Sequence, residues 1–94
     1  MTIRYADSKL PSWEDLRYFL AVAREGQMLA AARRLGVSQA LLSRHVVALE
    51  SAVGARLFDR TTRGSTLTGD GAALFATAER IEAAADTLVG RVEQ

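Results

Sequence analysis

One predicted helix carries the side chains best suited to contact the edges of nucleic-acid bases. Ser38 can cap its N-terminus, and the helical pattern continues to about Val53, just before Gly54. Helical spacing places small and polar residues together on one face: Gln39, Ala40, Ser43, Arg44 and Val47. Glutamine can pair with adenine, arginine can reach guanine or a phosphate, and small side chains allow close approach. This face predicts a helix that enters the major groove of DNA, with N-terminal N–H groups suited to a phosphate.

The segment after this helix predicts a short two-stranded hairpin. Residues 56–60 and 66–68 contain β-prone side chains, and the residues between them are rich in Thr, Gly and Ser. Arg63 and Gly64 are expected near the tip of the hairpin. An arginine there is placed to enter a minor groove, because narrow A·T-rich DNA concentrates negative potential.

A first helix is expected to support these elements. Ser12 and Asp15 form a capping-box pattern that opens it, and Gly26 ends it. Its apolar positions recur at helical spacing: Leu16, Phe19, Leu20 and Ala23. We expect Trp13 and Phe19 to lie in the core or at a dimer interface. Residues 1–11 show no period and predict a mostly extended tail.

A second, short helix is predicted over residues 28–35, before Gly36. Its expected apolar face consists of Leu29, Ala32 and Leu35. On the longer helix after it, four residues fall within one arc that should face the core: Leu42, Val46, Leu49 and Val53. Short helix, tight turn and longer helix form a helix-turn-helix pattern, in which the second helix of the pair enters the groove.

From Gly69 onward an alanine-rich run predicts a long final helix. Its apolar positions are more numerous than a small core can cover: Ala72, Phe75, Ala76, Ile81, Ala84, Leu88 and Val92. An exposed apolar stripe on a helix is typical of self-association. We therefore expect two chains to pair through residues 69–92.

The composition is that of one small folded domain. The chain has 94 residues, of which 49% are apolar and 24% charged, which argues against disorder and against a second domain. Its formal charge of +1 conceals an uneven distribution, because residues 38–68 are net basic and residues 69–94 net acidic. No apolar run is long enough to cross a bilayer, and the N-terminus has no secretory pattern. The lack of cysteine excludes disulfides and thiolate metal sites, which fits a cytoplasmic protein.

The sequence contains no pattern that indicates catalysis. His45 is the only histidine, and it lies two residues from Ser43 on a helix, so the two side chains point in different directions. We expect His45 to be a helix-flank residue and Glu50 to form an ion pair within the domain. Metal-ligand spacing and a phosphate-binding glycine loop are also missing. The expectation is a protein that is not an enzyme and uses no metal or cofactor.

Four stretches of the sequence carry a family pattern. They are LRYFLAVA at 16–23, AARRLGVSQALLSRHVVALE at 31–50, GARLFDR at 54–60 and RGSTLTGDG at 63–71. Together they resemble the N-terminal domain of bacterial LysR-type transcriptional regulators, in order and without gaps. The resemblance implies a mostly α-helical winged helix-turn-helix, with three helices and a β-hairpin wing, followed by a long linker helix that pairs two chains. Gln27 stands where the family often has a capping residue for the second helix.

The resemblance also implies contacts, residue by residue. The implied DNA contacts are Arg34, Ser38, Gln39, Ala40, Ser43, Arg44, Arg60, Thr62 and Arg63. The residues expected to pair two chains are Ala72, Phe75, Ala76, Ile81, Ala84 and Leu88. The implied target is double-stranded DNA with an interrupted palindromic operator, bound by a homodimer, with a tetramer as the alternative in the full-length protein. A small-molecule effector is expected only through a further domain, before which this chain stops.

We expect three parts: an N-terminal tail at residues 1–11, a winged helix-turn-helix at 12–68 and a linker or dimerisation helix at 69–94. The helix-turn-helix is expected at about 28–47 and the wing at about 56–68. The leading interpretation is sequence-specific DNA binding in transcription regulation, in the cytoplasm on the nucleoid and without membrane association. The alternative is a helical dimerisation or protein-interaction module that does not bind DNA, which would dimerise fully yet show no salt-sensitive DNA binding.

Overall fold

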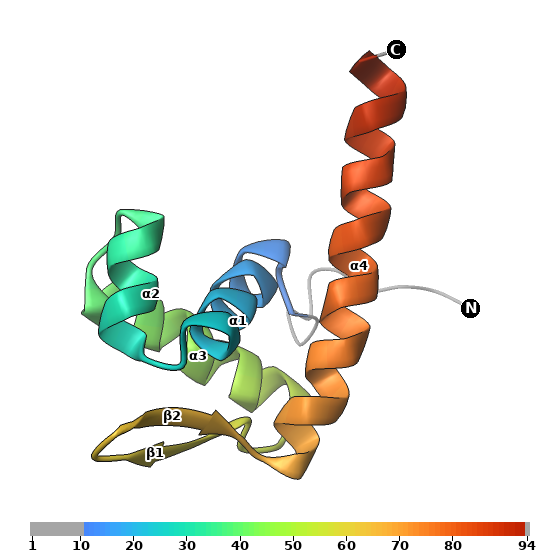
Figure 1. Ribbon diagram of the computed structural model, residues 1–94. Coiled ribbons are helices and arrows are strands. Elements are labelled where there is room, and N and C mark those ends of the chain that lie inside the picture. Colours follow the sequence, from blue (N-terminus) through green and yellow to red (C-terminus); the bar gives the residue numbers. More distant parts are fainter. Residues whose placement is uncertain (1–10, 94) are drawn as a thin grey trace.

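Four helices and one hairpin make up the part of the chain that the structure describes (Figure 1). It is a computed structural model that describes the backbone of residues 11–93 and the side chains of residues 11–90. The elements are α1 (Trp13–Glu25), α2 (Met28–Leu35), α3 (Gln39–Val53), β1 (Phe58–Thr61), β2 (Gly64–Leu67) and α4 (Gly69–Glu93). The predicted three-helix body, hairpin and long final helix are confirmed. The expected extended tail falls almost entirely on residues 1–10, outside the described residues.

The helix ends follow from local hydrogen bonds that the sequence provides. The Ser12 hydroxyl accepts from the backbone N–H of Asp15 at 3.1 Å, and the N–H of Ser12 donates to the Asp15 carboxylate at 3.4 Å. This capping box supplies partners that the first turn of α1 lacks. Each of α1, α2 and α3 ends at a glycine in the left-handed conformation. The expected starts and stops of the three body helices are therefore confirmed.

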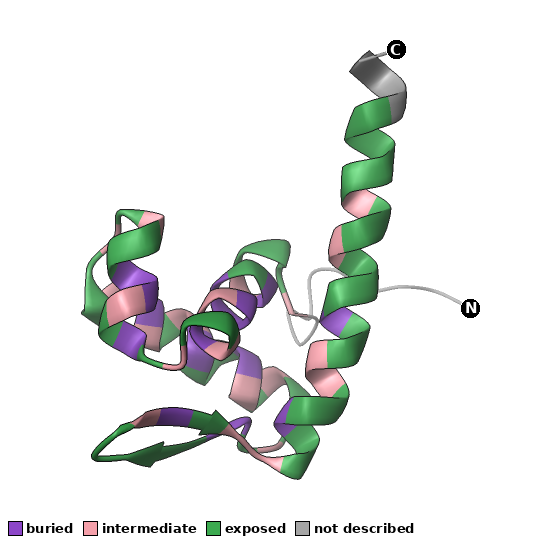
Figure 2. Cartoon of the chain, viewed as in Figure 1, coloured by how far each residue is buried: buried purple, intermediate pink, exposed green. Residues whose placement is uncertain are grey.

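The core lies between α1, α2 and α3 and is closed by the hairpin and the first turns of α4 (Figure 2). Phe19 is fully buried at its centre, with its ring centroid 5.4 Å from that of Phe58 and 6.4 Å from that of Phe75. Ala78 is the fully buried residue of α4. Burial of a large apolar side chain stabilises a fold by about 1.5–3 kcal/mol. The further fully buried large side chains are Leu20, Val22, Leu42, Val46, Leu49 and Leu57.

Two residues expected to face the core are exposed. Leu29 is 46% exposed because α2 turns a different face to the core, the one formed by Met28, Ala31 and Ala32. Val53 is 41% exposed at the last residue of α3, one turn beyond the buried Leu49. Helical spacing alone placed these two residues on the wrong side or too close to the core. Trp13, expected in the core or at a dimer interface, is 39% exposed and is not part of the core, so the dimer interface stays a prediction.

The hairpin is tighter than the sequence indicates. The strands are antiparallel, and Thr61 pairs with Gly64, so the loop consists of Thr62 and Arg63. Gly64 is the first residue of β2, directly after this loop, and therefore lies near the tip as expected. A Cβ at Gly64 would come 2.3 Å from the carbonyl oxygen of Gly26, and its φ of 146° disfavours other residues. The N–H of Ser65 donates to the same oxygen at 2.9 Å, which fixes the hairpin against the turn between α1 and α2.

Helix α4 leaves the body after its first turns and extends away from it (Figure 1). Leu74 and Phe75 are half-buried against the core, whereas Leu88 and Val89 are 65% and 54% exposed. Position along the helix explains this difference in exposure, because only the first part of α4 packs against the body. Phe75, expected among the residues that pair two chains, packs on Phe19 of the same chain and is half-buried there, so its part in pairing stays a prediction.

An ion-pair cluster fixes the direction in which α4 leaves the body. The Arg24 guanidinium of α1 donates to both carboxylate oxygens of Glu82, at 2.7 and 3.0 Å, and to Glu79 at 3.4 Å. It also lies 5.9 Å from the centroid of the Phe75 ring. The hydrogen bond to Glu82 raises the pKa of Arg24, and the same bond lowers the pKa of Glu82. Part of the acidity of the final helix thus serves an internal contact.

Candidate nucleic-acid interface

The N-terminus of α3 is capped, exposed and free of acidic residues. The Ser38 hydroxyl accepts from the N–H of Leu41 at 3.1 Å, as expected of an N-cap. Ser38, Gln39 and Ala40 are all exposed, and the first turn of α3 contains no carboxylate. A helix N-terminus carries a partial positive charge that favours anions. This end of α3 can therefore accept a phosphate without competition from its own side chains.

The predicted contact face of α3 is largely open to solvent. Gln39, Ala40 and Arg44 are exposed, as is Val47, whereas Ser43 is half-buried. The Ser43 hydroxyl accepts from the guanidinium of Arg60 in β1 at 3.3 Å. That hydrogen bond connects the hairpin to α3 and occupies the hydroxyl group expected to contact a base.

At the tip of the hairpin, the backbone of Arg63 is fixed by hydrogen bonds and its side chain is exposed. The N–H of Arg63 donates to the Thr61 hydroxyl at 3.2 Å, and the Gln27 side-chain amide donates to the Arg63 carbonyl at 3.4 Å. Gln27, the N-cap residue of α2, makes no side-chain capping bond and contacts the hairpin instead. Thr62 and the Arg63 side chain are exposed at the turn. An arginine on a fixed turn can enter a narrow groove with little loss of backbone entropy.

The arginines of this region divide into those with internal partners and those without. Arg34 approaches Glu25 at 3.9 Å, and Arg60 bonds Ser43. Within residues 11–90, three arginine side chains have neither a hydrogen bond nor an ion pair: Arg33, Arg44 and Arg63. The contacts expected from the sequence include Arg34 as a phosphate neighbour but not Arg33. The adjacent positions look alike in the sequence, and only the contact with Glu25 distinguishes them.

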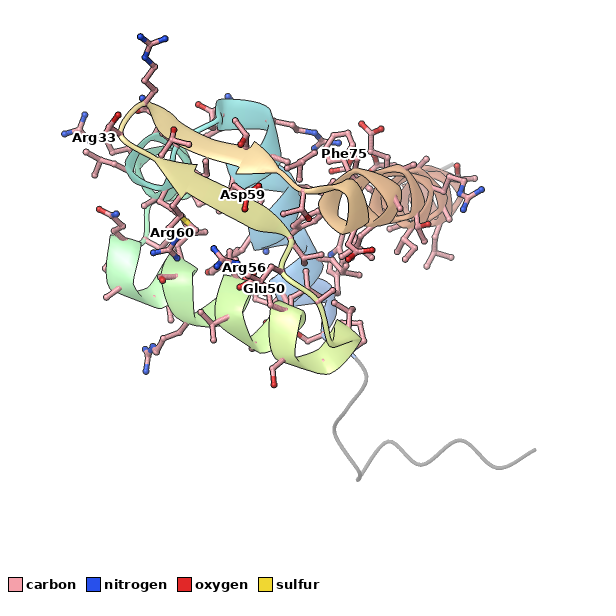
Figure 3. All side chains as sticks on the ribbon, turned by 90° about the horizontal axis from the view of Figure 1, so that it is seen from below. Arg33, Glu50, Arg56, Asp59, Arg60 and Phe75 are labelled. Carbon is pink, nitrogen blue, oxygen red and sulfur yellow. The ribbon has the colours of Figure 1, made fainter. Side chains whose placement is uncertain are left out.

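The base of the hairpin is held to α3 by a carboxylate. Figure 3 shows Glu50, Arg56 and Arg60 in the space between the hairpin and α3. The carboxylate of Glu50 accepts the backbone N–H of Leu57 at 2.8 Å, and it forms no ion pair with any residue in the described range. The predicted ion pair of Glu50 is therefore wrong. A carboxylate that caps a backbone N–H just before a strand fixes where that strand begins.

His45 joins α1 to α3. Its Nδ1 lies 2.7 Å from a carboxylate oxygen of Asp15, and its ring meets that of Tyr18 edge-on with centroids 4.4 Å apart. Ser43 bonds Arg60 on the other side of the helix. The two side chains thus have different partners, and His45 has the position of a packing residue at the flank of α3.

No group of three or more His, Cys, Asp or Glu side chains in residues 11–90 is arranged to hold a metal ion. None of the described helices combines the length and apolar character needed to cross a membrane.

The arrangement of capped α3, connected hairpin and long final helix has counterparts among known proteins. The family model described as bacterial regulatory helix-turn-helix protein, lysR family, matches residues 13–72, which is more than half of the chain. The chain belongs to the lysR family. This lysR-family chain is 48% identical over 69 residues to the HTH-type transcriptional regulator ClcR of Pseudomonas putida, covering 73% of this chain and 24% of ClcR. It spans about a quarter of that relative's length.

Solved structures of lysR-family domains agree with the fold. The chain is similar to the CbnR DNA-binding domain crystallised with DNA, with a TM-score of 0.81 and 41% identity, over 87% of this chain and 94% of that one. It is also similar to the BenM DNA-binding domain crystallised with benA site 1 DNA, with a TM-score of 0.82 and 30% identity, over 87% and 95%. Both neighbours are nearly spanned by this chain, so the likeness extends over the body and the final helix together.

Proposed function

We propose that this chain binds double-stranded DNA in a sequence-specific way, as the DNA-binding part of a lysR-family transcriptional regulator. The observation that carries the proposal is that two of the three exposed, partner-free arginines within residues 11–90 lie on α3 and at the hairpin tip: Arg44 and Arg63. They accompany an acid-free helix N-terminus, which can bind a phosphate. The similarity to the CbnR and BenM domains, both crystallised with DNA, supports the same function.

Each candidate residue then has a role that its environment allows. Helix α3 enters the major groove, where Gln39 and Arg44 contact base edges and Ala40 permits close approach. Arg63 enters the adjacent minor groove, flanked by Thr62. Arg60 acts mainly through Ser43, by holding the hairpin to α3. Phosphates are contacted by Ser38 and Arg34 as expected from sequence, and by Arg33, whose side chain has no partner within residues 11–90.

Two copies are needed to present two such surfaces to one operator. We propose a homodimer that pairs through the exposed part of α4, with Ala72, Ala76, Ile81, Ala84 and Leu88 in the interface. A two-fold dimer places its recognition helices one helical turn of DNA apart, or a multiple of it, so the operator is an interrupted palindrome. Tetramer formation and binding of a small-molecule effector are expected only with a further domain. The dimer would act in the cytoplasm on the nucleoid and without enzyme activity.

The proposal is tested by selecting bound duplexes from a random pool and measuring their affinity as a function of salt. We expect enrichment of a two-fold symmetric sequence, and a steep fall in affinity with rising salt because phosphate contacts release counterions. The helical interaction module without DNA binding predicts dimers but no enrichment and no salt-sensitive complex. That outcome would overturn the proposed function.

A further inference from the structure

Val47 is an apolar side chain at the C-terminal end of the α3 face that the proposed function turns toward DNA. It lies on α3 at helical spacing from three of the candidate contacts, in the order Ala40, Ser43, Arg44 and Val47. Its side chain is 53% exposed, although α3 also carries fully buried valine and leucine. Packing within the chain therefore does not account for a valine at this position.

The charged side chains near Val47 indicate what kind of molecule can bind this surface. Arg44, one turn before it, is an exposed cation with no partner within residues 11–90. Glu50 is the one carboxylate on α3, and it is directed to the N–H of Leu57 at the base of the hairpin. Val47 thus lies one turn from an exposed cation, and the one carboxylate of its own helix is engaged at the hairpin. Asp15 of α1 lines the same hollow as Arg44, but its carboxylate contacts His45 and Ser12. Such a surface attracts a polyanion more than the apolar stripe of a second chain.

The contact pattern of DNA-reading helices includes this position. In homeodomains, residues at i, i+3, i+4 and i+7 of the recognition helix face the major groove. Ala40, Ser43, Arg44 and Val47 have that spacing. Because the Ser43 hydroxyl already accepts from Arg60 at 3.3 Å, discrimination on this face depends on the remaining members. The major groove offers one apolar group to a valine, the 5-methyl group of thymine.

We propose that Val47 contacts the 5-methyl group of a thymine in the major groove and makes the chain prefer thymine at one position of each half-site. This inference rests on the proposed DNA binding. Val47 lies three residues, or about 4.5 Å along the helix axis, from Arg44. Since base pairs are spaced about 3.4 Å apart, the thymine is within about two base pairs of the base that Arg44 contacts.

The test uses the whole chain and the duplex selected from a random pool. Each thymine is replaced in turn by deoxyuridine, which removes only the methyl group, and affinity is measured by fluorescence anisotropy at fixed salt. At one symmetric position we expect the wild type to bind about fourfold more weakly, the ratio that corresponds to burial of one methyl group. Val47→Ala should bind the thymine duplex about equally weakly and show no further loss on deoxyuridine replacement at that position.

Two variants separate this contact from a general effect of truncation. Val53→Ala removes the same atoms from an exposed valine of the same helix, and it should keep the wild-type response to deoxyuridine. Val47→Thr retains one methyl group in nearly the same shape and should keep part of the response. Thermal unfolding of all three variants checks that the fold is unchanged. The response of the wild type to deoxyuridine needs no variant and tests the contact even if one unfolds.

The possible failures are distinguishable. The assignment of Val47 is overturned, and DNA binding stands, if the wild type binds a selected duplex but no deoxyuridine replacement weakens that binding. The same holds if the replacement weakens binding by Val47→Ala by the same factor as binding by the wild type. If the wild type enriches no duplex, the proposed function fails and this inference fails with it. If Val47→Ala loses dimerisation but responds to deoxyuridine replacement as the wild type does, Val47 lies at a protein interface and its assignment to thymine is overturned.

Discussion

Exposed arginines on the same molecule differ in whether they are available to a ligand. Arg44 on α3 and Arg80 on α4 are both exposed, but Arg80 donates to the hydroxyl of Thr77 at 3.3 Å, one turn earlier on its own helix. Arg44 has no such bond within residues 11–90. An arginine that already donates to a partner gives up that bond on binding, whereas a partner-free guanidinium keeps its planar fork for guanine or phosphate.

We predict that Arg44→Ala weakens binding of the selected duplex by about tenfold or more and relaxes the preferred base at one position. Loss of a base contact costs about 1–3 kcal/mol. Arg80→Ala removes the same charge from the chain and is expected to change affinity by less than threefold. Anisotropy titrations against the selected duplex and single-base variants measure both. Equal losses in the two variants would assign the effect of Arg44 to net charge alone.

At the scale of elements, the position of the wing depends on one glycine more than on its strands. A two-stranded hairpin alone is marginally stable in water. Here the Ser65 N–H bond to Gly26 and the close approach of Gly64 hold it against the turn between α1 and α2. On the other strand, Arg60, which lies directly opposite Ser65, holds the hairpin to α3 through Ser43. The wing therefore keeps a fixed position relative to α3.

We predict that Gly64→Ala destabilises the fold by about 1–3 kcal/mol, because the new Cβ collides with the Gly26 carbonyl at a backbone angle unsuited to alanine. Gly90→Ala is the matched control, since a Cβ there meets no atom within 4 Å and alanine favours helix. Denaturant unfolding of the two variants measures the difference. A Gly64→Ala variant as stable as Gly90→Ala would show that the wing is not held at this contact.

The contact between α1 and α4 has its own pH dependence. Because Arg24 lowers the pKa of Glu82, the contact contributes stability above the ordinary carboxyl pKa and loses it as pH falls through the lowered value. We predict that wild type exceeds Glu82→Gln in stability by a few tenths of a kcal/mol at pH 7, a small amount because the exposed pair is screened by solvent. The difference should shrink as the pH falls below the ordinary carboxyl range and disappear once Glu82 is protonated.

Unfolding titrations of the two proteins at several pH values measure this difference. Asp86→Asn is the control, because Asp86 is an exposed carboxylate of the same helix that forms no ion pair with another described residue. A constant difference between wild type and Glu82→Gln from pH 7 to pH 3 would contradict the assigned role of Glu82.

At the scale of the whole molecule, the apolar side chains in the second half of the long helix are not covered by the other described residues. The core reaches α4 as far as Ala78 and Arg24 contacts Glu82, but Ile81, Leu88 and Val89 remain exposed (Figure 2). An isolated helical extension gains little stability from propensity, since helices in proteins depend on packing of an apolar face. Pairing with a second copy would supply that packing and would place two wings on one duplex.

We predict that Leu88→Glu converts the dimer to monomers, because it places a charge in the proposed apolar interface. The body should stay folded, because the Leu88 side chain is 65% exposed in the single chain. Affinity for a duplex with two half-sites should fall much more than affinity for a single half-site. Sedimentation measures the oligomeric state. Leu29→Glu, at an exposed leucine on α2, should leave the dimer intact, and dimer loss in both variants would indicate a nonspecific effect.

The sequence by itself determined the elements and the family, because caps, glycine stops and apolar period are local properties of the chain. Ser12, Ser38 and Gly26 mark helix ends wherever the helices pack. The four family stretches are also read directly from the order of residues along the chain, and the family model covers all of them. Val92, expected on the stripe of the final helix, lies outside the described side chains.

Contacts between elements could be decided only by the tertiary structure. Which of Arg33 and Arg34 meets Glu25, whether Ser43 is free or bonded to Arg60, and where Phe75 packs depend on how elements far apart in sequence meet. Periodicity assigns a face to each residue but not the neighbour that covers it, so Val47 appeared as one member of a polar face. Its exposure beside a partner-free cation follows from packing, since burial is a property of the assembled elements and not of any one of them.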